Sequence, residues 1–218
     1  MIDFDIHAAM AILSETMPRF QQPLVDAMGA AGQTPFRILI ATILSLRTQD
    51  RLTAVVAPRL FTAADTPAAL LALDEERIAE LIYPVGFYRT KARSIRQVCA
   101  LLIERHGGAV PADLDALLAL PGVGRKTANL VLTMGFGRPG ICVDTHVHQI
   151  CNRWGYVQTK DPDRTELALR AKLPQQYWIA INGLLVTLGQ NICHPTSPRC
   201  SACPVAHLCA RIGVTRSR

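Results

Sequence analysis

Residues 120–128 decide the fold, and they read Leu-Pro-Gly-Val-Gly-Arg-Lys-Thr-Ala. Leucines at helical spacing precede this stretch, and a second apolar run that begins at Leu130 follows it. Glycine tolerates a positive φ and lets another backbone approach closely. The stretch therefore predicts two helices joined by a tight hairpin at 122–124, with Arg125 and Lys126 opening the second helix.

The same hairpin suggests a chemistry. Backbone N–H groups at the start of a helix have no carbonyl partner within that helix, and the helix dipole makes that end positive. A phosphate can bind there without any side chain, and Arg125 and Lys126 add positive charge at the same place. A plain loop between packed helices is the alternative, because Gly-x-Gly alone is common. The lysine and the basic chain favour phosphate binding.

Composition fits a compact protein with a polyanionic partner. The chain has 218 residues, of which 50% are hydrophobic, and its formal net charge is +6. This length suits one globular protein or two small lobes. The segments 85–97, 121–140 and 191–218 contain basic residues and no acidic ones. Solvated helix faces also carry such charge, but three acid-free segments favour a nucleic-acid surface.

Targeting signals are not evident in the sequence. No charged start is followed by an apolar core and a cleavage site, and no apolar run is long enough to cross a membrane. We therefore expect a cytoplasmic, nucleoid-associated protein. In that compartment its seven cysteines are expected to be reduced.

Helical periodicity runs along the chain without strand alternation, so the sequence predicts an all-α fold. Thr34 and Pro35 form a helix entrance, and the helix that follows is apolar nearly all round, so it is expected to be buried. The break at Pro139 and Gly140 is a candidate lobe boundary. The expected helices are 2–20, 36–46, 52–61, 67–73, 75–83, 91–105, the pair at the hairpin, 144–154, 164–173 and 176–188.

The C-terminal cysteines indicate a metal centre. Their spacing is C-x6-C-x2-C-x5-C, and the four are Cys193, Cys200, Cys203 and Cys209. Zinc ribbons usually offer two separated pairs, whereas one compact loop suits an iron–sulfur cluster. Zinc, or four unrelated buried thiols, are the alternatives. The other cysteines lie on apolar stretches and are predicted to be core residues: Cys99, Cys142 and Cys151.

Three features coincide in order along the chain: the hairpin at 120–128, Val-Asp-Thr-His-Val at 143–147 and the cysteine loop at 193–209. Together they resemble the endonuclease III family of helix-hairpin-helix DNA glycosylases, over nearly the whole chain. The resemblance implies a two-lobe all-α fold. One lobe would be a six-helix barrel at 27–138, and the other would combine 1–26 with 139–218 and carry a [4Fe–4S] cluster.

The resemblance also implies an activity. The family removes oxidised pyrimidines from duplex DNA and cleaves the resulting abasic site by β-elimination, as part of base excision repair. Its catalytic lysine falls on Lys126 and its catalytic aspartate on Asp144. An amine can attack the sugar C1′ and form a Schiff base, and a carboxylate can stabilise positive charge on the sugar. A phosphate contact by Lys126 and a helix N-cap at Asp144 are the alternatives, and Asp144 can serve both purposes.

Base extrusion requires residues that fill the gap left in the duplex. By resemblance, Phe87 is the intercalating wedge, where well-known members carry leucine, and Arg47 stands where many members have glutamine. A core phenylalanine is the alternative for Phe87, and a helix-surface histidine is the alternative for His146. The expected DNA-binding residues are Gly122, Val123, Gly124, Arg125, Thr127, Arg47, Phe87, Lys91 and His146.

Rival functions differ at named positions. Adenine-removing mismatch glycosylases of the superfamily use a glutamate on the helix around 38–46 and lack the lysine, and thymine–guanine mismatch members typically have tyrosine there. Here the stretch 36–49 holds no carboxylate, and Lys126 is present. We therefore expect a monomeric bifunctional glycosylase and lyase. The alternatives are a mismatch-specific glycosylase and a non-catalytic iron–sulfur protein that binds DNA or carries electrons.

Overall fold

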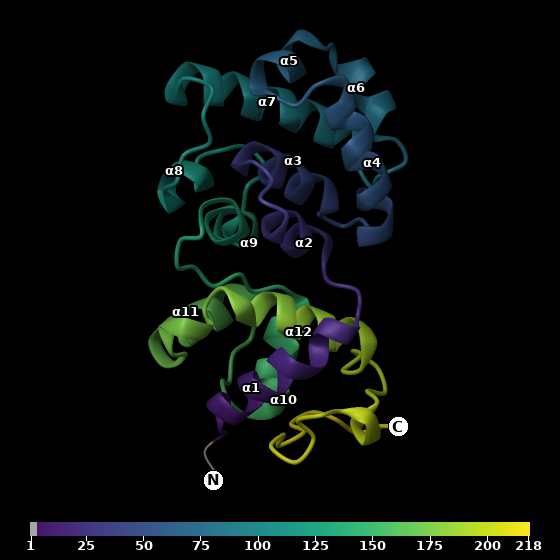
Figure 1. Ribbon diagram of the computed structural model, residues 1–218, viewed down its shortest axis with the longest axis vertical. Coiled ribbons are helices and arrows are strands. Elements are labelled where there is room, and N and C mark those ends of the chain that lie inside the picture. The colour runs from purple at the N-terminus through teal and green to yellow at the C-terminus, as the bar shows by residue number, and fades with distance from the viewer. Residues whose placement is uncertain (1–3) are drawn as a thin grey trace. The chain divides into compact units, whose positions relative to one another are not determined.

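The computed structural model describes residues 4–218, and this part of the chain is helical, with no strand (Figure 1). The all-α prediction is therefore confirmed. No helix within the described range is long and apolar enough to cross a membrane. The chain divides into two compact units, one formed by Leu24–Arg138 and the other by Met1–Pro23 together with Pro139–Arg218.

The unit Leu24–Arg138 is a bundle in which α5 and α6 pack on α7, while α3 packs on α2, α4, α7 and the π-helical turn η2. The hairpin helices α8 and α9 follow the long helix α7 in the chain (Figure 1). The elements are α2 (Leu24–Ala30), α3 (Pro35–Ser45), α4 (Asp50–Ala63), α5 (Pro67–Ala72), α6 (Glu75–Ile82), α7 (Tyr88–His106), α8 (Leu114–Leu118), α9 (Arg125–Leu130) and η2 (Val131–Gly135).

The helix α3 forms the centre of this unit. Thr34 caps it by accepting a hydrogen bond from the backbone N–H of Arg37 at 3.3 Å, and Pro35 occupies the first turn. The side chains from Ile38 to Leu44 are all buried, as the apolar sequence predicts. Full burial of each large aliphatic side chain contributes about 1.5–3 kcal/mol, so this helix anchors the loop that follows it.

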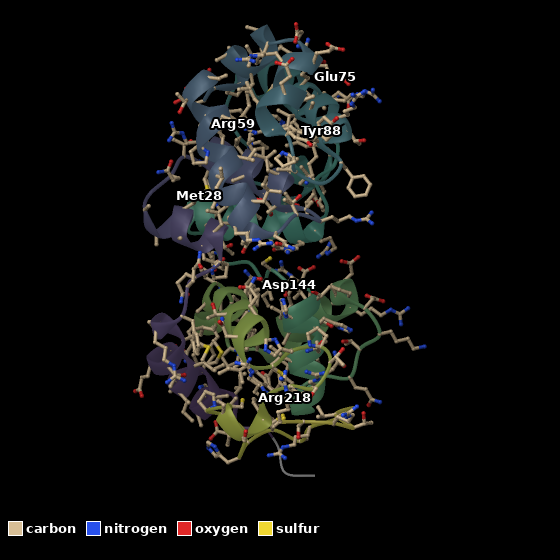
Figure 2. All side chains as sticks on the ribbon, turned by 90° about the vertical axis from the view of Figure 1, so that its right-hand side faces the viewer. Met28, Arg59, Glu75, Tyr88, Asp144 and Arg218 are labelled. Atoms are coloured by element: carbon tan, nitrogen blue, oxygen red, sulfur yellow. The ribbon has the colours of Figure 1, made fainter. Side chains whose placement is uncertain are left out.

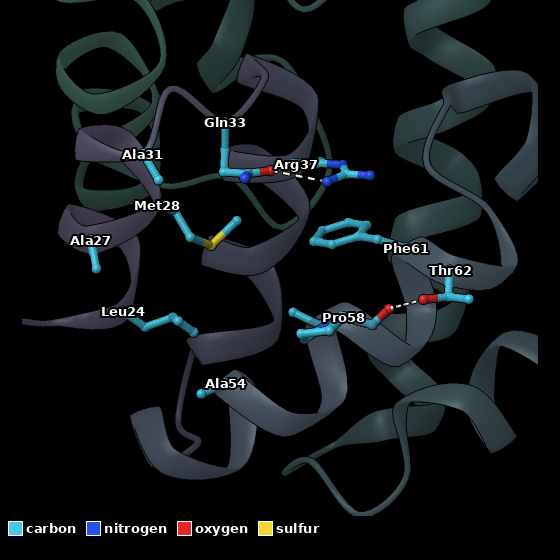
Figure 3. A pocket seen from close by; sticks show the side chains of 11 residues that line it. Leu24, Ala27, Met28, Ala31, Gln33, Arg37, Ala54, Pro58, Phe61 and Thr62 are labelled. Carbon is cyan, nitrogen blue, oxygen red and sulfur yellow. Dashed lines mark hydrogen bonds between the residues drawn. The ribbon is translucent and has the colours of Figure 1, made fainter.

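A cavity of about 430 Å³ lies between α2, α3 and α4 of the same unit (Figure 3). Met28 and Phe61 line it from different helices, and Arg37 lies at one side, where it donates a hydrogen bond to Gln33 at 3.0 Å. The residues predicted to bind DNA or to catalyse do not belong to its lining. The cavity is therefore separate from the candidate site.

The other unit combines the two ends of the chain. The helix α12 packs on α1 and α10, and the ring of Phe4 stacks on Trp154 with centroids 4.6 Å apart. Buried side chains of α1 such as Met10 and Leu13 share one core with those of α10 and α12. The elements are α1 (Ile6–Thr16), η1 (Met17–Arg19), α10 (Thr145–Trp154), α11 (Pro162–Lys172), η3 (Gln175–Tyr177), α12 (Ala180–Asn191) and η4 (Cys200–Ala202).

Some element boundaries differ from the sequence prediction. The helix α2 was not predicted, because its seven residues include Gly29 and carry too short an apolar pattern. The predicted helix at 2–20 begins at Ile6 and ends in a 3₁₀ turn, and residues 2 and 3 lie outside the described part. The predicted helix at 176–188 instead starts as the 3₁₀ turn η3, and α12 begins only at Ala180.

Candidate DNA-binding and catalytic site

The hairpin between α8 and α9 is built by two buried anchors and two glycines. Leu120 and Val123 are buried, and the N–H of Val123 donates to the carbonyl of Leu120 at 3.2 Å. Gly122 has φ +76°, a conformation that favours glycine. Gly124 is the N-cap of α9 and has an ordinary φ of −94°, and a Cβ added there would meet nothing within 4 Å. The hairpin therefore presents an open backbone at the start of α9.

The first turn of α9 exposes one side of the helix and buries the other. Lys126 is exposed and Arg125 is half-buried, whereas Thr127 is 1% exposed. The side chains of Thr127 and Val123 are buried, and the expected contact between these two residues and DNA stays a prediction. Only their backbone groups can take part, and Lys126 is the residue of this turn whose amine reaches solvent.

Asp144 occupies the N-cap of α10 in the other unit (Figure 2). Its Oδ1 accepts hydrogen bonds from the backbone N–H groups of His146 at 2.8 Å and Val147 at 2.9 Å. The capping role is therefore confirmed. Two N–H donors and the positive end of α10 stabilise the charged carboxylate, and they hold it in one orientation.

His146 lies in the first turn of the same helix. It is half-buried, and its ring faces Gly189 of α12 so closely that a Cβ on that glycine would lie 2.2 Å from the ring Nδ1. A side chain at position 189 would therefore displace the histidine. The expected contact between His146 and DNA stays a prediction.

Arg47 and Phe87 lie together in the unit Leu24–Arg138. The guanidinium carbon of Arg47 lies 4.5 Å from the centroid of the Phe87 ring. Phe87 is 57% exposed, so the alternative of a core phenylalanine is wrong. Both residues have a positive φ, +54° for Arg47 and +58° for Phe87. This conformation costs a non-glycine residue about 1–2 kcal/mol, so the surrounding structure must impose it.

Hydrogen bonds from Lys91 help to hold the loop in which Arg47 has its positive φ. Its Nζ donates to the carbonyl oxygens of Leu44 at 2.7 Å and Leu46 at 2.6 Å, and to Oγ1 of Thr48 at 2.9 Å. The residue is only 7% exposed. The three acceptors match the three ammonium hydrogens, and the expected contact between Lys91 and DNA stays a prediction. Desolvation by burial lowers the pKa of Lys91 to about 8.

The four C-terminal cysteines line one cavity, together with Arg153. All are half-buried free thiols. Within residues 4–218, no group of three His, Cys, Asp or Glu side chains is arranged so that it could hold a metal ion. Four cysteine thiolates are the ligand set of a [4Fe–4S] cluster, so four cysteines around one cavity fit an iron–sulfur centre. Burial raises the pKa of the Cys203 thiol to about 11, so metal binding must displace its proton.

The remaining cysteines belong to the cores of the two units. Cys99 and Cys151 are fully buried, and Cys142 is 1% exposed, which confirms the prediction for all three. Burial raises the pKa of the Cys99 thiol to about 12, and it also raises the pKa of Cys151. Such thiols stay protonated and act as small apolar groups.

Two residues that hold the loops of the candidate site in place, Thr48 and Arg153, could not be recognised in the sequence. Thr48 links segments far apart in the chain, because its Oγ1 accepts from the N–H of Gly86 at 3.1 Å as well as from Lys91. Arg153 is 9% exposed and donates to the cysteine loop. The only sequence signal for Arg153 is an arginine on the last turn of an amphipathic helix, which usually indicates an exposed residue.

Comparison with known proteins agrees with this arrangement. Residues 40–175 match the family model of the HhH-GPD superfamily base excision DNA repair proteins. Residues 193–209, from the first to the last cysteine of the loop, match the iron–sulfur binding domain of endonuclease III. The endonuclease III of Thermotoga maritima is 47% identical over 80% of this chain and 82% of its own length.

Solved structures of endonuclease III are also similar to this chain. A non-covalent endonuclease III–DNA complex superposes with a TM-score of 0.84 and 36% identity, over 94% of both chains. A trapped endonuclease III–DNA covalent intermediate matches with the same values. By sequence and by fold, the chain belongs to the endonuclease III family of the HhH-GPD superfamily, and it is a base excision repair DNA glycosylase and abasic-site lyase with a [4Fe–4S] cluster.

Proposed function

We propose that this enzyme removes oxidised pyrimidines from duplex DNA and then cuts the strand, with Lys126 as nucleophile and Asp144 as the carboxylate that stabilises positive charge on the sugar. The observation that carries the proposal is the exposed Lys126 in the first turn of α9, directly after an open glycine hairpin. We further propose that the protein works as a monomer on chromosomal DNA in the cytoplasm.

Binding would begin at the hairpin. Gly122 and Gly124 are both exposed, and the start of α9 carries the positive end of the helix dipole together with Arg125. A DNA phosphate fits this end of the helix without reading any base. Lys126 would then lie beside the sugar that follows the bound phosphate.

Catalysis would proceed through a covalent intermediate on Lys126. The neutral amine attacks C1′, the glycosidic bond breaks, and the base leaves with its bonding electrons and a proton. The C1′–O4′ bond then breaks as the nitrogen lone pair forms the C=N bond, and O4′ takes up a proton, which gives a protonated Schiff base. The Schiff base acidifies the C2′ proton, whose removal expels the 3′ phosphate by β-elimination. Water then releases the lysine and the cleaved sugar.

Asp144 would stabilise the positive charge that develops on the sugar during base loss. The two N–H donors from α10 fix its carboxylate before the substrate arrives, so no reorganisation is needed during the reaction. An Oδ atom held in this way can also receive and return a proton. The N-cap and the catalytic role therefore use the same preorganised group.

We also propose that the cluster ligands are Cys193, Cys200, Cys203 and Cys209. When bound, the cluster cross-links the loop that these thiolates share. The buried Arg153 donates to Sγ of Cys193 at 3.3 Å and to the carbonyl of His194 at 2.8 Å. A positive charge there offsets part of the negative charge that four thiolates bring to the loop.

Borohydride trapping tests the proposal. Purified enzyme would be mixed with duplexes that contain an oxidised pyrimidine, an abasic site, a T·G mismatch or an A·G mismatch, and then reduced. We expect a covalent adduct with the first two duplexes. An adduct with the abasic duplex alone would overturn the glycosylase specificity, and no adduct with any duplex would overturn the lysine mechanism.

A further inference from the structure

We propose that the cluster site extends past its last cysteine, because residues 210–218 (the tail) close one side of the cysteine cavity and the Arg211 backbone donates a hydrogen bond to Cys209. This inference rests on the cluster ligands of the proposed function. It goes beyond them, since the match to the iron–sulfur binding domain ends at residue 209. It gives the tail two roles, which are to keep solvent from the cluster and to raise its reduction potential.

The first argument is that the tail forms part of the wall of the cysteine cavity. Arg211 and Val214 line this cavity together with the four cysteines. Val214 is half-buried, whereas the residues on either side of it are exposed. Its N–H donates to the carbonyl of Arg211 at 3.0 Å, so the two lining residues belong to one turn. Val214 therefore adds an apolar side chain to the wall, and an apolar wall limits the access of water to the sulfur atoms.

The second argument is that the tail is attached at two places. Near its start, the N–H of Ile212 donates to the carbonyl of Arg153 in α10 at 3.0 Å. At its other end, which lies beside η4 in Figure 1, the N–H of Arg218 donates to the carbonyl of Pro198 at 2.8 Å. The carbonyl of Arg218 accepts from the N–H of Ser201 at 3.0 Å. The tail is therefore held to α10 and to the cysteine loop, with Val214 between the two attachments.

The third argument is a direct contact with one ligand. The backbone N–H of Arg211 donates to Sγ of Cys209 at 3.3 Å. Arg211 has φ +56°, a left-handed conformation that is unfavourable for a residue with a Cβ, so the surrounding contacts must impose it. Burial raises the pKa of the Cys209 thiol, whereas this N–H and the Arg211 guanidinium favour the thiolate. The thiolate is the form that binds metal, so Arg211 favours ligation by Cys209.

The same hydrogen bond affects the electron affinity of the bound cluster. An N–H donor stabilises negative charge on the sulfur, so the reduced form gains more than the oxidised form. Hydrogen bonds to the sulfur atoms and solvent exposure are both factors that set the potential of such clusters. Loss of the Arg211 N–H should therefore lower the reduction potential, and a gap at Val214 should expose the iron to a chelator.

The hydrogen bond is tested by two variants of the full chain at one position. Arg211→Pro lacks the N–H and cannot adopt a positive φ, whereas Arg211→Gly keeps the N–H and adopts that φ freely. We expect a lower reduction potential in Arg211→Pro than in Arg211→Gly. Loss of visible absorbance to an iron chelator should be about tenfold faster in Arg211→Pro, the lower end of the effect of losing an outer-shell partner. Failure of Arg211→Pro alone to take up iron would show the same dependence.

The wall is tested separately at two aliphatic positions of the tail. Val214→Ser should lose iron to the chelator faster than the wild type. Ile212→Ser is the matched control, because Ile212 is 57% exposed, and it should lose iron at the wild-type rate. A wild type that carries the cluster, with the same potential and the same rate of iron loss in all four variants, would overturn this inference alone. A wild type that takes up no iron would also overturn the proposed ligands.

Discussion

Arg153 donates a hydrogen bond from Nη1 to Sγ of Cys193 at 3.3 Å, and its other contacts go to backbone carbonyls of the same loop. Arg153 is only 9% exposed and lies in the last turn of α10, so this hydrogen bond joins the helix to the first cysteine of the loop. The helix α10 therefore has the catalytic candidate Asp144 as its N-cap and contacts the cysteine loop through Arg153 in its last turn.

The first prediction follows from this contact. Arg153→Gln cannot span the same acceptors, and each buried acceptor left without a donor costs about 1–3 kcal/mol. We expect lower thermal stability and faster loss of the cluster's visible absorbance during incubation with an iron chelator. The exposed Arg164→Gln is the control and should change stability by no more than about 0.5 kcal/mol. Equal chelator resistance in the two variants would contradict the prediction.

The second prediction concerns the hairpin. Gly124→Ala should leave folding intact, because position 124 has an ordinary φ and open space around it. The added methyl group lies where we expect a phosphate, so affinity for undamaged duplexes should fall about equally for all sequences. Thermal unfolding checks that the variant is folded, and binding isotherms at several salt concentrations measure its affinity for DNA. Normal affinity in this variant would show that the phosphate is bound elsewhere.

The third prediction separates unstacking from chemistry. Phe87→Ala should slow the excision of an oxidised base, whereas cleavage of an abasic site should be less affected, because no base has to be displaced there. The melting temperature should change little, since Phe87 is 57% exposed. Comparison of the two rates on otherwise identical duplexes is the measurement. An equal loss of both activities would argue against a wedge.

The fourth prediction concerns the nucleophile. Lys126→Gln should abolish strand cleavage and the borohydride-trapped adduct, while DNA binding largely survives through the hairpin backbone and the other basic residues. Because Lys126 is exposed, the variant should remain folded. Lys160→Gln removes another exposed lysine and should trap normally. An undiminished adduct in Lys126→Gln would identify a different amine as the nucleophile.

The fifth prediction is a pH dependence. Burial lowers the pKa of Lys91 from 10.5 to about 8, so between these values the unfolded chain binds more protons than the folded one. Stability contributed by this residue therefore rises with pH from about 8 to about 10.5. Lys91→Met should be less stable than the wild type, and the difference should widen over that range. Urea unfolding at several pH values measures it, and a difference that narrows would refute the prediction.

Sequence patterns located most of the chemistry without a structure. The cap at Thr34, the buried helix after it and the capping role of Asp144 were all predictable, because each depends on neighbours within one or two turns. The hairpin was predictable for the same reason. By contrast, the buried roles of Thr127 and Val123 could not be recognised, since burial depends on which elements pack against a helix.

Charge alone proved a poor guide to which cations face solvent. Lys91 and Arg153 belong to a basic chain with a formal net charge of +6, and Lys91 lies within an acid-free segment. Both side chains are nevertheless buried against backbone carbonyls. Those carbonyls lie 47 residues away in the chain from Lys91, at Leu44, and 41 residues away from Arg153, at His194. No local pattern records a contact over that separation.

The sequence by itself determined most of the helices, the glycine hairpin, the cysteine loop and the candidates Lys126 and Asp144. These features follow from backbone preferences and ligand chemistry, which act over a few residues. Only the tertiary structure decided that Arg47 and Phe87 meet, that Lys91 and Thr48 lock their loops together, and that Arg153 supports Cys193. Such contacts form when the packing of whole helices brings distant segments together, and the energy that fixes them belongs to the assembled core.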